Sequence, residues 1–98
     1  MPASPAADLK DSHERLMAQS QQRMLEFLQA EIQLGFTFAE FAIAERDLGN
    51  HSHARRSNED AQKALTSVRQ FVSKISDPDA ADQVLVWCHQ LENALAAV

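Results

Sequence analysis

Residues 31–50 read EIQLGFTFAEFAIAERDLGN, and this stretch decides the fold. It contains Phe36, Phe38 and Phe41, three of the five phenylalanines in the 98-residue chain. At the 3.6-residue period of an α-helix, its apolar residues fall on two faces rather than one. A helix with two apolar faces needs neighbours on both sides, so the stretch predicts a central helix in an all-helical domain.

The helix has two apolar faces, which we call the main stripe and the seam. We expect the first face, the main stripe, to pack against the rest of the domain; it consists of Leu28, Leu34, Phe38, Phe41 and Leu48. The second face, the seam, lies about 140° away on the helical wheel and has the spacing of a coiled-coil contact. It consists of Leu25, Ile32, Phe36 and Ile43. The seam is either core within one subunit or a contact between subunits.

The apolar spacing predicts three helices, over residues 8–48, 52–75 and 78–97. We expect the first helix to continue through Gly35, with a break near that residue as the alternative. With short connections, the helices form a three-helix up-down-up bundle with a long first helix. Residues 1–7 contain two prolines and small side chains, which predicts a flexible leader before a single helical domain over residues 8–98.

The connections carry clear turn signals. Gly49 is expected just after the first helix, because glycine is the usual residue beyond a helix end. Asn50 or Ser52 is expected to cap the second helix. Asp77 followed by Pro78 predicts the start of the third helix, since aspartate accepts from free backbone N–H groups and proline fits the first helical position.

The length of the first helix predicts self-association. At 1.5 Å per residue it would be about 60 Å long, whereas the other two helices would be only about 36 and 30 Å long. Two short helices cannot cover a rod of that length, so apolar side chains near Leu16 and Met24 would be left exposed. Monomers seldom expose a large apolar patch. We therefore expect a homodimer, with the first helix as the main contact and the seam as its interface.

Composition excludes several classes of function. The net charge of −5 argues against nucleic acid as a partner, because phosphate binding needs a surplus of basic residues. The single cysteine rules out an internal disulfide. No apolar run approaches the roughly 20 residues that span a membrane, and the N-terminus lacks a secretory pattern. A cytoplasmic protein without membrane contact is expected.

Three patterns could carry chemistry, and each has a simpler explanation. His51 and His53, with nearby acids, could bind a metal, but metal sites need three or four converging ligands. Cys88 precedes a histidine, yet neighbouring helical residues point about 100° apart, so the thiol is expected to be a core residue. A basic second helix could bind anions; its candidates are Arg55, Arg56, Lys63 and Arg69. We expect no cofactor, no metal and no catalytic residue, and hence no enzyme.

Residues 34–65 resemble a tetratricopeptide helical hairpin. Leu34-Gly35 with Phe38 is similar to the first helix of that motif. Gly49 and Ala54, followed by Ala61 and Ala64-Leu65, are similar to its turn and second helix. The resemblance covers about a third of the chain. It implies antiparallel packing of the two helices and a scaffold or peptide-binding role.

Together these patterns predict a non-enzymatic helical protein–protein interaction module, a self-associating adaptor or regulatory partner. The expected partner is a second copy, and another protein is a further candidate. The alternative is a helical bundle that binds a metal or small ligand through His51, His53 and nearby acids.

Overall fold

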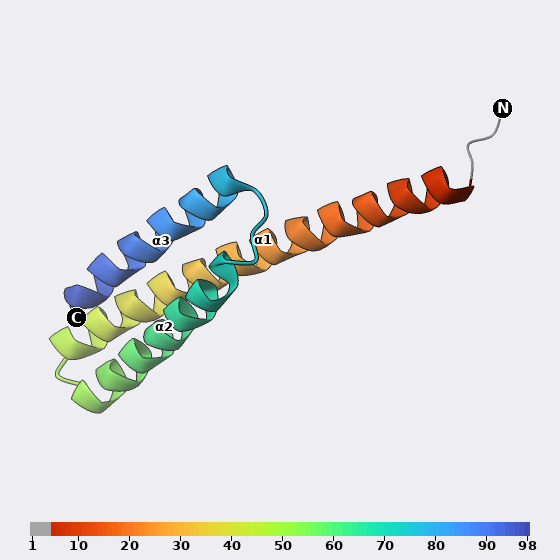
Figure 1. The fold of residues 1–98 in the computed structure, drawn as a ribbon. Coiled ribbons are helices and arrows are strands. Elements are labelled where there is room, and N and C mark those ends of the chain that lie inside the picture. The colour runs from red at the N-terminus through yellow and green to blue at the C-terminus, as the bar shows by residue number, and fades with distance from the viewer. Residues whose placement is uncertain (1–4) are drawn as a thin grey trace.

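The computed structural model describes residues 5–98, with side chains from residue 8 onward. These residues form three α-helices: α1 (Pro5–Asp47), α2 (His51–Val72) and α3 (Pro78–Ala96). The described residues contain no strand. The predicted all-α, three-helix architecture with a long first helix is therefore confirmed. Figure 1 shows α2 and α3 lying beside the C-terminal part of α1, while the N-terminal part of α1 extends beyond them.

The helix ends differ slightly from those expected. α1 begins at Pro5 rather than at residue 8, so the predicted leader overlaps the helix; residues 1–4 lie outside the described residues. α1 runs without interruption through Gly35, as expected, and the alternative of a break near this residue is not observed. α2 ends at Val72, earlier than expected, and the chain reaches α3 through a short connection. None of the helices formed by residues 5–98 is apolar over a stretch long enough to cross a bilayer.

The turn between α1 and α2 is built around Gly49. Its φ of +83° lies in the left-handed region, where a Cβ would be strained. The Gly49 N–H donates to the carbonyl of Arg46, and the Asn50 N–H donates to the carbonyl of Glu45 (2.8 Å). This pair of bonds is a Schellman motif, which satisfies carbonyls left free at a helix end. Asn50 precedes α2, but its side chain donates to Glu45 instead of capping the helix.

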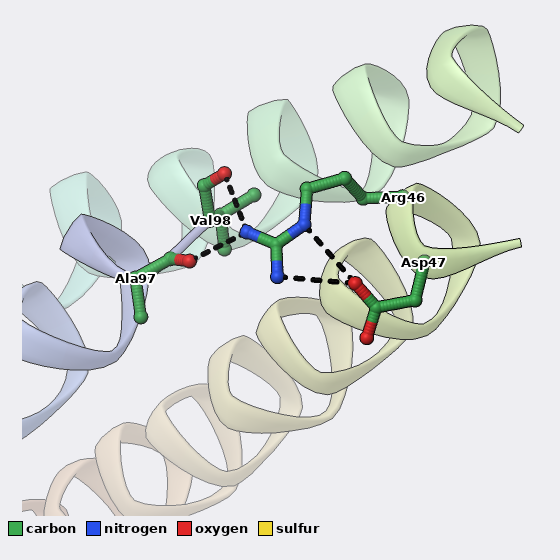
Figure 2. A network of polar contacts seen from close by, with 4 residues as sticks. All are labelled: Arg46, Asp47, Ala97 and Val98. Atoms are coloured by element: carbon green, nitrogen blue, oxygen red, sulfur yellow. Dashed lines mark hydrogen bonds and ion pairs between the residues drawn. The ribbon is translucent and has the colours of Figure 1, made fainter. Parts of the chain in front are cut away.

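α3 is fixed at both of its ends. The Asp77 carboxylate accepts from the backbone N–H of Asp79, and Pro78 occupies the first turn, as the sequence predicts. At the other end, Nη1 of Arg46 donates to the carbonyls of Ala97 (2.7 Å) and Val98 (3.1 Å). Figure 2 shows this guanidinium between the end of α3 and Asp47 of α1. A cation is favourable there because the C-terminal end of a helix carries partial negative charge.

The core is formed by all three helices. It combines bulky residues from each of them with a set of alanines between α1 and α2. Its fully buried side chains include Leu28, Val68, Val84, Cys88 and Leu91, each at most 2% exposed. No buried polar or charged residue occurs within the part of the chain whose side chains are described. Burial of apolar surface therefore provides the main stabilisation of the bundle.

The three helices come close together at Gly35. A Cβ built on this glycine would lie 2.6 Å from Cδ2 of Leu91 in α3 and 3.5 Å from the Cβ of Ala64 in α2. The glycine is therefore required for packing, although glycine within a helix costs about 1 kcal/mol relative to alanine. Small residues on the same side of α1, Ala39 and Ala42, are also buried.

We expect Gly35→Ala to destabilise the protein by about 1 kcal/mol, because displacing the fully buried Leu91 outweighs the gain in helix propensity. In a Leu91→Val background the clashing Cδ2 atom is absent. There the same substitution should stabilise by up to about 1 kcal/mol. Urea denaturation of the four proteins in this double-mutant cycle measures both effects. Equal effects of Gly35→Ala in the two backgrounds would contradict the assigned contact.

Candidate interaction surface

A line of exposed apolar side chains, interrupted at Arg23, runs along the outer side of α1 and ends at Leu48, one residue after the helix; we call it the outer stripe. It consists of Leu9 (72% exposed), Leu16 (62%), Phe27 (48%), Leu34 (44%), Phe41 (53%) and Leu48 (75%). Neighbouring members are seven residues apart, except that eleven separate Leu16 from Phe27. Seven and eleven residues are close to two and three helical turns, so the six side chains share one face of the helix. The stripe runs along almost the whole of α1.

The outer stripe reverses the predicted roles of the two faces of α1. In the main stripe, Leu28 is buried and Phe38 is half-buried, but Leu34, Phe41 and Leu48 are exposed. The prediction that this face receives the other helices was wrong for these three residues.

The seam lies on the inner side of α1. Ile32 is 3% exposed and belongs to the core, while Leu25 and Phe36 pack against that core. Ile43 is half-buried. The seam could be core within one subunit or a contact between subunits, and this burial favours the first interpretation. Ile32 has almost no free surface with which to contact a second copy.

The reversal has a physical reason in the size of the residues between the helices. α2 packs on a face of α1 that contains Gly35, Ala39 and Ala42, and it presents its own alanines to α1. Small residues allow close approach, which brings backbone and side-chain atoms into contact along both helices. Large apolar residues dominate the helical wheel of α1, so its apolar pattern does not reveal this face of small residues. The small residues of α1, spaced by four and three, and Ala54, Ala61 and Ala64 in α2 were the available signal.

The N-terminal part of the described α1 extends beyond the other two helices. Every side chain over residues 8–20 is exposed, and we call this segment the arm. Gln21 forms hydrogen bonds from α1 to the connection between α2 and α3. Its Nε2 donates to the carbonyl of Lys74, and its Oε1 accepts from the backbone N–H of Ser76. The arm is visible in Figure 1 as the part of α1 beyond the α2–α3 connection.

The outer stripe extends sideways onto α2 at one point. The rings of Phe27 and Phe71 meet edge to face, with centroids 6.1 Å apart. Nζ of Lys74 lies 5.0 Å from the centroid of the Phe71 ring, a cation–π contact. The surface beside Phe27 is therefore aromatic with a basic edge.

The flanks of the outer stripe are charged unevenly. Residues 26–48 carry five acids and one base, whereas residues 8–25 carry three of each. The two halves of α1 thus differ in net charge. This difference can orient a partner that lies along the helix, although each exposed ion pair contributes only about 0–1 kcal/mol.

On another side of α1, two shallow grooves lie near the start of α3. Both are lined by Gln22 and Leu25. One, of about 160 Å³, is closed by Val84 and Trp87, and the other runs toward Met17. Neither lining contains a cluster of titratable side chains.

The residues predicted for metal or anion binding do not converge. His51 and His53 are exposed at the start of α2. Among residues 5–98, no three His, Cys, Asp or Glu side chains come together as a metal site would require. Arg69 forms an ion pair with Glu92 of α3, so one of the four basic candidates already has a structural role.

Comparison of the chain with protein-family models, curated proteins and solved structures gives no significant match.

We expect Cys88 to react slowly with thiol reagents in the folded protein. Burial in α3 raises the pKa of its thiol; the Arg69 charge lowers this pKa and the Glu92 charge raises it, and the net shift is upward. A raised pKa leaves less of the reactive thiolate at a given pH, and burial also blocks access. Modification at pH 8 with a chromogenic disulfide reagent measures the rate. The same reaction in denaturant is the control, and equal rates would contradict the burial of this thiol.

Proposed function

We propose that this protein is a non-enzymatic interaction module that self-associates through the outer side of α1. The observation that supports the proposal is the exposure of six large apolar side chains in one line along a helix. Water-exposed apolar surface of this kind is typical of interfaces. A cytoplasmic location and a role as an adaptor or regulatory partner belong to the same proposal.

The size of the outer stripe supports a specific contact. Taking about 150–200 Å² for a fully exposed large side chain, the six residues expose on the order of 600 Å² per copy. Burying two such stripes against each other would remove on the order of 1,200 Å², the lower limit for a stable interface. Flanking side chains would add to this area. The outer stripe is therefore large enough for a homodimer.

The spacing of the outer stripe supports a helical partner. From Phe27 to Leu48 its members recur every seven residues, which is the repeat of a two-stranded coiled coil. Three residues after Phe27, Leu34 and Phe41 come Ala30, Thr37 and Ala44, which are small and exposed. Alternation of large and small residues lets side chains of one helix insert between those of another. The resemblance to a tetratricopeptide hairpin, which implies a scaffold role, remains a prediction.

We expect Phe41→Glu to raise the dimer dissociation constant by about 100-fold, because a symmetric dimer carries the substitution twice at about 1.4 kcal/mol each. Sedimentation velocity across a concentration series measures the change. Val86→Glu is the matched control, since Val86 is 48% exposed and lies on the opposite side of α3 from its buried residues Val84, Cys88 and Leu91.

The control protein should dimerise like the unchanged chain. Three results would contradict the proposal: a monomer at high micromolar concentration in the unchanged protein, an unaltered dimer with Phe41→Glu, or equal weakening by Val86→Glu. Circular dichroism of each variant checks that the helices are retained.

A further inference from the structure

We propose that the second copy lies antiparallel on the outer stripe, so that the arm of each copy covers the C-terminal half of the other copy's stripe. The inference rests on the self-association proposed above and specifies its geometry. The protein would then form an elongated dimer with a helical bundle at each end. In this arrangement the arm is a binding element for a second copy of the same chain.

The positions of the stripe residues favour this register. Leu9 and Leu48 lie at equal distances from the point between residues 28 and 29, and so do Leu16 and Phe41. In a two-fold antiparallel pair centred at that point, Leu9 therefore opposes the partner's Leu48, and Leu16 opposes the partner's Phe41. Near the centre, Phe27 opposes Ala30, a large residue against a small one. Each large residue of one stripe thus meets a residue of the opposite heptad position, as antiparallel helix packing requires.

Charge disfavours the parallel alternative. Arg23 lies seven residues after Leu16, in line with the outer stripe, and is exposed. In a parallel, in-register pair, Arg23 of one copy would face Arg23 of the other copy. Glu40 and Glu45 flank the stripe five residues apart, and parallel packing sets such positions against each other across the contact, whereas the antiparallel register sets them level with the partner's Met17 and Ser12. Like charges in contact oppose association.

Antiparallel packing relieves the contact between arginines. Arg23 then opposes the partner's Leu34, on the half of α1 that carries five acids and one base. The arm side of α1, with three bases and three acids, lies along that acidic half over its whole length. Contact between the arm side and the acidic half is thus electrostatically more favourable than contact between two acidic halves.

The length of outer stripe that the partner covers distinguishes this register from other antiparallel registers. If the two bundles met face to face with Phe41 opposite Ala30, the arms would point outward with Leu9 and Leu16 still exposed. Centring the pair between residues 28 and 29 covers the stripe from Leu9 to Leu48 in both copies, about 58 Å of helix at 1.5 Å per residue. The same contact then covers the apolar residues of the arm and the exposed stripe residues beside the bundle.

Cysteine cross-linking tests the register. Leu16→Cys and Phe41→Cys would be made separately in a Cys88→Ser background, and sedimentation velocity would first establish that each variant is a dimer. Under mild oxidation, an equal mixture of the two variants should give a disulfide-linked dimer. Each variant oxidised alone should give no disulfide-linked dimer. The pair Leu9→Cys and Leu48→Cys samples the same register independently, and all four positions are exposed, so folding is preserved.

Each outcome has a distinct meaning. Linking of Phe41→Cys to itself would indicate parallel helices, and its linking to Ala30→Cys would indicate the face-to-face register; either result overturns this inference but leaves self-association intact. A dimer in which neither mixed pair links also overturns the inference alone. If the unchanged chain and the variants sediment as monomers at every concentration, self-association itself fails, and the inference fails with it.

Discussion

At Gly35 the backbone of α1 lies so close to α3 that an added Cβ would stand 2.6 Å from Cδ2 of Leu91. This close approach sets the rotation of α1 about its own axis. Once the side of α1 with Gly35, Ala39 and Ala42 faces inward, the residues on the opposite side must face solvent. The exposure of Phe41 and Leu48 is thus a consequence of how closely the helices pack at small residues.

The two connections and their polar contacts hold the bundle at both ends. Arg46 joins the end of α3 to the α1–α2 turn, and Gln21 joins α1 to the chain segment that follows α2. Because these contacts lie at opposite ends of the short helices, α2 and α3 have a fixed register along α1. The outer stripe is therefore presented by a supported helix over its C-terminal half, and such rigid presentation reduces the entropy lost on binding.

Much of the fold could be predicted from the sequence. The three helices, the turn at Gly49 and the cap at Asp77 follow from local signals that act over a few residues. The orientation of α1 could not be predicted from apolar periodicity, because Leu34 and Ile32 are equally apolar and both lie on helical stripes. What decided between them was the fit of small residues across α1 and α2, which depends on two segments at once. From the sequence the seam was the candidate interface, whereas the exposed large apolar residues of α1 lie on its other stripe.

α1 is one helix with two kinds of support. From Leu28 onward it is held by tertiary contacts, whereas over residues 8–20 only the helix's own hydrogen bonds maintain it. A free helix of that length is marginal in water, but here the bundle supplies the nucleus from which it extends. Amide hydrogen exchange should therefore slow progressively along α1 from the arm toward the bundle. If the arm frays, free energy is needed to order it before it can bind. The more the arm frays, the weaker any contact made there would be.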